Sequence, residues 1–351
     1  MRMLKSAWLP VLGVLLLAAP VSAQKAPERE AVRSQVDAYR EKAKQAARIF
    51  LDASKSDDQR AAAVAGVTIF LEKEQVDGAI AVFRNEGESG RIRALALSRI
   101  PHARAQNDQI LTDVLKVIRN SAAPLNLRQT SMRVLQEMLF SSMSAHLRHD
   151  EVFAMLRELT RDQNLSMREA AFQILAAHGD EATQALLLDG LKSKKGALLP
   201  PDESVRLLGL RARSEMYPVF HLLLVSPPDE KTKVECVRLL GGYEPSRKII
   251  IGFLQNPNES TAVRQAALAT LNANDAEHLA EHALPVIIDE RTSDTLRVYG
   301  ILAVQQRRVS QKMLLSGAGE FDRAVQKLAE DSPSKEVTEA ARRYLREVQQ
   351  K

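Results

Sequence analysis

The sequence predicts an all-α solenoid of about nine stacked helical hairpins. A short residue pattern recurs nine times at a mean spacing close to 35 residues. Apolar residues follow helical spacing along the whole chain, and strand patterns are almost absent. A unit of about 35 residues holds two helices and two turns and cannot bury its own apolar faces, so consecutive units have to stack.

The first 23 residues have the three parts of a secretory signal. Arg2 and Lys5 form a basic start, residues 8–19 are almost entirely apolar, and small residues precede the expected cleavage point. A helix that spans a bilayer needs about 20 apolar residues, and this run is shorter. We therefore predict cleavage between Ala23 and Gln24, which leaves one solenoid domain over residues 24–351.

The cysteine count indicates the cellular compartment of the protein, and the net charge limits the class of partner that it binds. Cys236 is the only cysteine, so no intrachain disulfide forms, and export without disulfides fits a bacterial periplasm. Two sequons, at Asn164 and Asn258, leave eukaryotic secretion open, although Asn in these places is also a common helix cap. Removing the signal lowers the formal charge from +5 to +3, which is too mild to favour a nucleic-acid partner.

The repeated pattern is built on a basic reference position and a small residue three positions later. The reference positions are Arg60, Arg93, Arg128, Arg168, Arg206, Lys233, Arg264, Arg297 and Thr338. The small residues are Ala63, Ala96, Ser131, Ala171, Gly209, Cys236, Ala267, Gly300 and Ala341. A small side chain lets neighbouring helices approach to about 8–10 Å. An apolar residue follows seven positions after each reference except at Arg213.

This pattern resembles the HEAT repeat, whose second helix is typically marked by Val-Arg-x-x-Ala-x-x-x-Leu. Residues 263–271 match it at every marked position, and the resemblance covers about residues 30–349. It implies a HEAT-like superhelix in which the Arg column is structural. It also implies an acid before the second helix that pairs with the Arg, and Asp162 and Asn258 stand six residues before Arg168 and Arg264.

The first helices of the hairpins fill the gaps between these segments. Residues 30–52 carry an apolar face from Val32 to Phe50. The remaining first helices are expected over residues 75–84, 108–119, 151–161, 181–191, 216–224, 247–254, 276–288 and 321–330. Proline and glycine separate them. A polar last helix near residues 337–348 suits a terminal cap.

Three connections are longer than the rest, at residues 140–149, 192–203 and 306–319. Insertions of this kind often project from one face of a solenoid and bind partners. We expect partner contacts from the second helices and from these linkers. The candidate contact residues are Lys192, Lys194, Lys195, His146 and His149.

One catalytic motif is present, His-x-x-Glu-His at His278, Glu281 and His282. In inverted zinc metalloproteases two such His bind zinc and the Glu is the general base. Only 69 residues follow His282 to supply a third ligand, and Leu279, Ala283 and Ile287 predict that both His face solvent. A metal-dependent hydrolase is therefore the alternative rather than the leading interpretation.

The leading interpretation is an exported scaffold that binds other proteins, is not an enzyme, needs no cofactor and is monomeric. No nucleophile elbow, phosphate-binding glycine loop or Cys–His pair is found, and the buried position expected for Cys236 makes it an inert thiol. Trp8 leaves with the signal, and so few aromatic residues remain that base or sugar stacking is not expected.

Overall fold

The structure, a computed structural model, describes residues 26–101, 108–140, 148–193 and 197–349. Within these ranges every regular element is a helix, and no strand occurs. The all-α fold class predicted from the sequence is confirmed, and the helices form hairpins of the HEAT-like type. We call the first helix of each hairpin an A helix and the second a B helix.

The chain divides into two compact units, one ending at Ala171 and one beginning at Phe172, inside α10. The A helices of the first unit are α2 (Ala26–Phe50), α4 (Lys73–Arg84), α7 (Asp108–Arg119) and α9 (His149–Leu159). Its B helices are α3 (Asp57–Ala63), α5 (Gly90–Leu97), α8 (Leu125–Leu139) and the start of α10 (Leu165–Ala177). Helix α5 packs on α3, α4 and α8, so neighbouring hairpins share one core.

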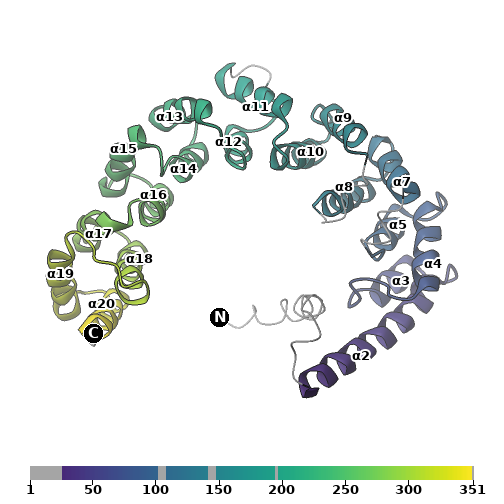
Figure 1. The fold of residues 1–351 in the computed structure, drawn as a ribbon, viewed down its shortest axis with the longest axis horizontal. Helices are drawn as coiled ribbons and strands as arrows, with labels where there is room; N and C mark the ends of the chain where they lie inside the picture. The colour runs from purple at the N-terminus through teal and green to yellow at the C-terminus, as the bar shows by residue number, and fades with distance from the viewer. Residues whose placement is uncertain (1–25, 102–107, 141–147, 194–196, 350–351) are drawn as a thin grey trace. The chain divides into compact units, whose positions relative to one another are not determined.

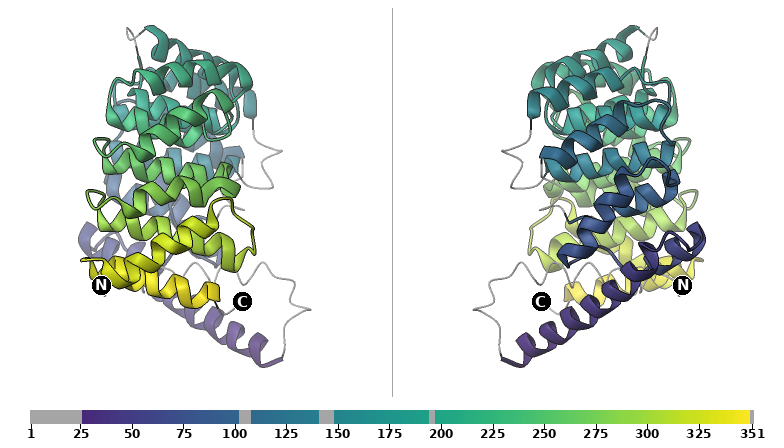
Figure 2. Two further views of the ribbon diagram at one scale, coloured as in Figure 1. Left: turned by 90° about the vertical axis from the view of Figure 1, so that its left-hand side faces the viewer. Right: turned by 90° about the vertical axis from the view of Figure 1, so that its right-hand side faces the viewer.

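The second unit repeats this arrangement, and its two rows are seen in Figure 1. Its A helices are α11 (Glu181–Ser193), α13 (Tyr217–Val225), α15 (Glu244–Gln255), α17 (Leu279–Ile288) and α19 (Ala318–Asp331). Its B helices are α12 (Pro201–Gly209), α14 (Glu230–Leu239), α16 (Thr261–Asn274), α18 (Asp294–Gln305) and α20 (Lys335–Gln349). Figure 2 shows helices of this unit stacked hairpin on hairpin.

The small residues of the repeat lie where helices meet. Ala96, Ala171, Cys236, Ala267 and Ala341 are completely buried. At Gly300 an added Cβ would stand 2.9 Å from Cγ2 of Ile287, on the A helix of the same hairpin. A larger side chain there would push α18 away from α17, which explains why this column contains only small residues.

The predicted A helices agree with the structure to within a few residues, but the linkers are shorter than expected. His149 is the first residue of α9 and not part of a linker. Helix α11 continues to Ser193, and α12 begins at Pro201. The third linker contains a π-helical turn, Gln306–Ser310, before α19 begins at Ala318. Helices therefore occupy one end of the first predicted connection and both ends of the second and third.

The predicted signal and its cleavage point lie outside the described residues. In the described part of the chain no helix has both the length and the apolar character needed to cross a membrane. The single domain over residues 24–351 stays a prediction.

Candidate functional site

Arginines at the reference positions of the repeat cap the C-terminal ends of the A helices. In five hairpins Nε donates to the carbonyl ten residues earlier, at 2.7–3.1 Å. The pairs are Arg60–Phe50, Arg93–Phe83, Arg128–Ile118, Arg264–Leu254 and Arg297–Ile287. These carbonyls lie at helix C-termini, where they have no partner within the helix and the helix dipole favours a cation. The Arg column therefore has a local structural role in these hairpins.

Four cations of the column also reach the next hairpin. Arg60 pairs with Glu88 at 2.6 Å, Arg128 pairs with Asp162 at 2.5 Å, and Arg264 donates to the Thr292 hydroxyl at 2.9 Å. Lys233 pairs with Glu259 in the same way. Three of these acceptors stand five residues before the next reference position and Asp162 stands six before it. The contacts form a ladder between hairpins.

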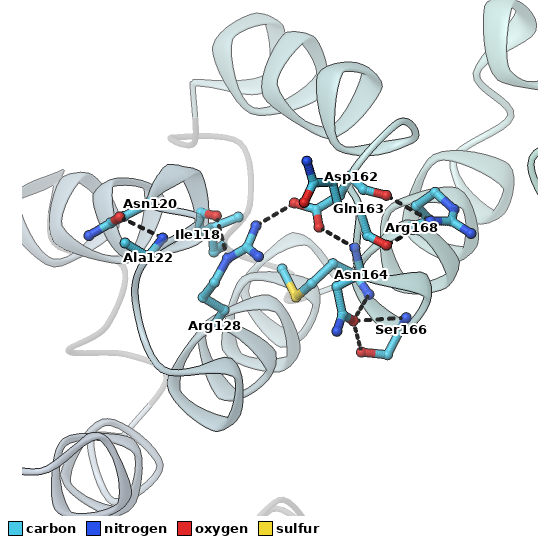
Figure 3. A network of polar contacts seen from close by, with 10 residues as sticks. Ile118, Asn120, Ala122, Arg128, Asp162, Gln163, Asn164, Ser166 and Arg168 are labelled. Atoms are coloured by element: carbon cyan, nitrogen blue, oxygen red, sulfur yellow. Dashed lines mark hydrogen bonds and ion pairs between the residues drawn. The ribbon is translucent and has the colours of Figure 1, made fainter.

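The Arg128 step is drawn in Figure 3. Its guanidinium bridges the Ile118 carbonyl and the Asp162 carboxylate, and only 4% of the Arg128 side chain is exposed. Burial alone would raise the pKa of Asp162, but the hydrogen bond from Arg128 and the amide of Asn164 together lower it. Asp162 therefore stays ionised in the ladder.

Asn258 does not take the part that the sequence suggested for it. Its neighbour Glu259 is the acceptor, whereas the Asn258 amide donates to the side chain of Asn256 within the turn. Glu88 and Glu259 stand five residues before the next reference position and not six, so the expected six-residue spacing does not point to them. An acid or hydroxyl residue recurs five positions before the reference residue, at Glu88, Glu259 and Thr292. This recurrence was the signal that would have revealed the acceptors.

Arg168 and Arg206 do not follow the column. Arg168 donates to the carbonyls of Asp162 and Gln163, and Arg206 pairs with Glu203 on its own helix. The residues five and six before the next reference are prolines in both cases, so no acceptor side chain is offered there. These two arginines are bound within their own hairpin instead.

Arg93 keeps only the bond inside its hairpin. Its Nε donates to Phe83 at 2.9 Å, and neither of its η nitrogens has a hydrogen-bond or ion-pair partner among the described residues. The η nitrogens of Arg297 also make no hydrogen bond within this part of the chain, but Nη1 of Arg297 pairs with Asp294 at 3.5 Å. Arg93 lines an open concavity of about 610 Å³ between the turns of two hairpins. Ala122 and Ala123 line it where neighbouring hairpins have an acid.

The predicted zinc motif folds into a cluster around Asp275. His278 Nδ1 and His282 Nε2 each lie 2.8 Å from a different oxygen of the Asp275 carboxylate. Glu281 instead hydrogen-bonds Ser316 in the third linker. The prediction that both His face solvent is wrong for His282, whose side chain is only 11% exposed, whereas His278 is 45% exposed.

Hydrogen bonds also set the protonation of this cluster. Burial would raise the pKa of Asp275, but the bonds from His282 and His278 outweigh it and lower the pKa. The bond to Asp275, with the nearby Glu281 and Glu277, raises the pKa of His278. Across the described residues no group of three His, Cys, Asp or Glu is arranged to hold a metal ion. Both His side chains instead hydrogen-bond the carboxylate of Asp275.

Cys236 lies in the core of the second unit, fully buried on α14. Desolvation raises the pKa of its thiol to about 12. The thiolate, which is the reactive form, is therefore scarce at neutral pH.

Helix α13 carries an apolar surface that the repeat pattern does not predict. Its sequence, YPVFHLLLV, contains no Asp, Glu, Lys or Arg, and its polar side-chain groups are the Tyr217 hydroxyl and the His221 ring. Leu222 is 69% exposed and Val225 59% exposed, and Pro218 is exposed one turn before Leu222. We call these three residues the α13 face. Tyr217 borders it and stacks on Tyr243, with ring centroids 5.4 Å apart.

Two of the five predicted partner-contact residues, Lys192 and His149, are among the described residues. Lys192 is exposed in the last turn of α11. His149 is half-buried at the start of α9, with its ring 5.9 Å from that of Phe153. Lys194, Lys195 and His146 lie outside the described residues. Neither Lys192 nor His149 belongs to the α13 face or lines the concavity at Arg93. The partner role of all five residues stays a prediction.

Comparison with known proteins identifies similar folds only. No family model matches the sequence, and no curated protein matches it. A solved complex of CpcE and CpcF of phycocyanin lyase from Nostoc sp. PCC7120 is 14% identical. It covers 78% of this chain and 94% of its own, with a TM-score of 0.38. Human deoxyhypusine hydroxylase in complex with glycerol is 12% identical. It covers 90% of this chain and 99% of its own, with a TM-score of 0.30.

The prediction that the chain is not an enzyme is wrong as a conclusion from its fold. That prediction combined the repeat fold with the lack of familiar motifs. Both similar structures are named for enzymes, a lyase and a hydroxylase. A helical-repeat fold therefore does not exclude catalysis. At these scores the likeness concerns the fold and assigns no reaction to this chain.

Proposed function

We propose that this chain is an exported helical-repeat protein that binds another polypeptide through the α13 face. One observation carries the proposal: an A helix without any Asp, Glu, Lys or Arg leaves Pro218, Leu222 and Val225 in solvent. A helix that is apolar all round is normally buried on all sides. Apolar side chains at positions i, i+4 and i+7 form one stripe, and a stripe of this kind marks an interaction surface.

The chemistry of the stripe favours a polypeptide with apolar side chains over a lipid surface. Helices that lie on membranes carry Lys and Arg beside their apolar face. Helix α13 has neither, and its His221 ring is held by the Ser246 hydroxyl at 2.8 Å. The adjacent Tyr217–Tyr243 stack adds aromatic area of the kind that is enriched in protein interfaces.

Export, the periplasmic location and the monomeric state belong to the same proposal. The support for export is the basic, apolar and small-residue order of residues 1–23. We expect the exported protein to begin at Gln24 when its N-terminus is sequenced, and to sediment as a monomer. A cell-associated protein that keeps residues 1–23 would contradict the location without affecting the binding test.

Site-specific crosslinking tests the binding surface. A photoreactive amino acid replaces Leu222 on the α13 face or, as the control, Gln326, which is exposed on the A helix α19. We expect one defined adduct from position 222 and none from position 326. Once mass spectrometry has identified the partner, the purified pair should associate, and Leu222→Lys should weaken the association at least tenfold.

Two outcomes contradict the proposal. Equal crosslinking from both positions would mean that the α13 face is not selective. Sedimentation with phosphatidylcholine–phosphatidylglycerol vesicles that Leu222→Lys abolishes would assign the face to a membrane. Circular dichroism of Leu222→Lys ensures that a lost interaction is not lost folding.

A further inference from the structure

The concavity at Arg93 lies between the α4–α5 turn and the α7–α8 turn of the first unit. Three cations line it, Arg84, Arg93 and Lys116, together with the carboxylates of Glu86 and Asp113. Arg84 pairs with Asp113 at 2.6 Å, and Lys116 pairs with Glu86 at 3.3 Å. These pairs leave the single positive charge of Arg93 uncompensated.

The next hairpin contains an occupied version of the same site. A concavity of about 570 Å³ there is lined by Arg128 and by the Asp162-Gln163-Asn164 turn. Asp162 occupies the place opposite Arg128, at 2.5 Å from its Nη2 (Figure 3). The positions equivalent to Asp162 and to the acceptors at Glu88, Glu259 and Thr292 are Ala122 and Ala123. Both alanines line the Arg93 concavity.

We propose that the Arg93 concavity is a binding site for one carboxylate of an acidic polypeptide segment. The incoming carboxylate takes the place that Asp162 takes in the next hairpin. Two η nitrogens of a guanidinium match two carboxylate oxygens, and such charge-assisted bonds are about twice as strong as neutral ones. Pro124, which also lines the site, is the N-cap residue of α8 and supplies no side-chain cap, so the positive end of that helix is left open to an anion.

The charge balance favours a carboxylate over a phosphate. With Arg84 and Lys116 already paired, one unmatched cation faces a ligand. A carboxylate carries one negative charge, whereas a phosphate monoester carries about −1.5 to −2 at neutral pH. This site lies in the other unit from the α13 face, so the inference stands whether or not that face binds a partner.

The proposal is tested by offering Arg93 a carboxylate in two ways, on an added peptide and on a substituted residue of the chain itself. The probe is a fluorescein-labelled hexapeptide, Gly-Ser-Asp-Gln-Asn-Ser, which copies the turn that fills the next site; Asn replaces Asp in the control peptide. We expect fluorescence anisotropy to show that the mature protein binds the acidic peptide at least about tenfold more tightly than the control, the usual effect of one charged hydrogen bond.

Variants at Ala123 test the site without removing Arg93. Ala123→Glu places a carboxylate where Glu88 stands in the preceding hairpin, so it should abolish peptide binding and raise the melting temperature. Ala123→Gln has the same size without the charge and should leave binding within about threefold of the wild type. Arg93→Gln should weaken binding about tenfold or more.

Two results overturn the proposal. One is equal binding of the acidic and control peptides, or unchanged binding in Ala123→Glu. The other is binding of inorganic phosphate that requires Arg93 while the acidic peptide does not bind, which would assign the site to a free anion. Because Ala123→Glu has a stability readout as well as a binding readout, a misfolded variant would be recognised by a lowered melting temperature.

Discussion

At Arg60 the guanidinium joins two hairpins from an almost fully buried position. Only 3% of its side chain is exposed, and it binds the Phe50 carbonyl and both oxygens of Glu88. Its Cζ also lies 5.6 Å from the centre of the Phe50 ring. A charge can be buried in this way only when its hydrogen bonds are satisfied. The same residue type on the surface makes a much weaker contribution.

We expect Arg60→Ala to lower the free energy of unfolding by about 3 kcal/mol, since it leaves the Phe50 carbonyl and the partly buried Glu88 without a partner. The matched control is Arg91→Ala, because Arg91 pairs with Asp58 at 2.5 Å on the surface. An exposed pair is worth about 0–1 kcal/mol. Urea denaturation of both variants measures the difference, and equal losses would show that burial of the ladder is not what matters.

The Asp275 cluster makes stability depend on pH. The folded pKa of His278 is raised, so its stabilising contribution is complete below about pH 6.5 and is lost as the pH rises through the folded pKa. The folded pKa of Asp275 is lowered, so its contribution is present above about pH 3.9 and is lost as the pH falls through the folded value. The pair therefore stabilises the fold most between these limits.

His278→Gln removes the part of this dependence that comes from His278, while the hydrogen bond between His282 and Asp275 stays. The difference in urea midpoint between the wild type and His278→Gln should be largest near pH 5.5 and should shrink towards pH 8.5. A difference that stays constant over this range would mean that the His278–Asp275 contact is not coupled to protonation. The neighbouring Glu277→Gln serves as control, because Glu277 contributes least among the groups that raise the pKa of His278.

On the scale of single helices, α13 separates a packing face from an exposed face. Leu224 is completely buried and Leu222 is 69% exposed, although they stand two residues apart. Leu224→Ala should cost about 2–5 kcal/mol of unfolding free energy, because it leaves a cavity in the core. Leu222→Ala should change it by at most about 0.5 kcal/mol. Thermal or urea denaturation compares them, and a large loss for Leu222→Ala would mean that its exposure has been misjudged.

Helix α17 shows which buried residues the helical pattern of the sequence predicts and which it misses. The stripe Leu279, Ala283 and Ile287 is buried as predicted, but so are Ala280, His282 and Val286. The helix packs against α15, α18 and α19, so more than one face is covered. Assuming that an A helix buries only one face therefore leads to the wrong prediction that His282 faces solvent. Asp275, which precedes the 3₁₀ turn Ala276–His278, belongs to no repeat position, so the sequence pattern did not point to it.

Across the whole molecule, the period and the helix positions were predictable, and the partners of the side chains were not. The Arg column recurs because an Arg caps the C-terminus of the A helix in five of the hairpins. The small-residue column recurs because the B helices pack against their neighbours in the same way. The ladder joins residues 26 to 34 positions apart, so its acceptor depends on the conformation of each turn. That the η nitrogens of Arg93 have no partner in the described part of the chain can be recognised only once the acceptors in the neighbouring hairpins are known.

The two units give the last prediction. Helical repeats contact only their neighbours, so a change in one hairpin acts mainly on adjacent hairpins. Arg60 lies in the first unit and Cys236 in the second. The buried thiol, with its pKa raised to about 12, reacts with a disulfide reagent only when α14 opens. Cys236 therefore reports unfolding of the second unit.

We expect Arg60→Ala to lower the urea midpoint of helix loss seen by circular dichroism while the midpoint of Cys236 labelling stays unchanged. Leu224→Ala should shift the labelling midpoint, because α13 packs directly on α14. If Arg60→Ala moves the Cys236 midpoint as far as it moves the dichroism midpoint, the two units unfold as one cooperative body. In that case the nearest-neighbour description of the solenoid does not hold for this chain.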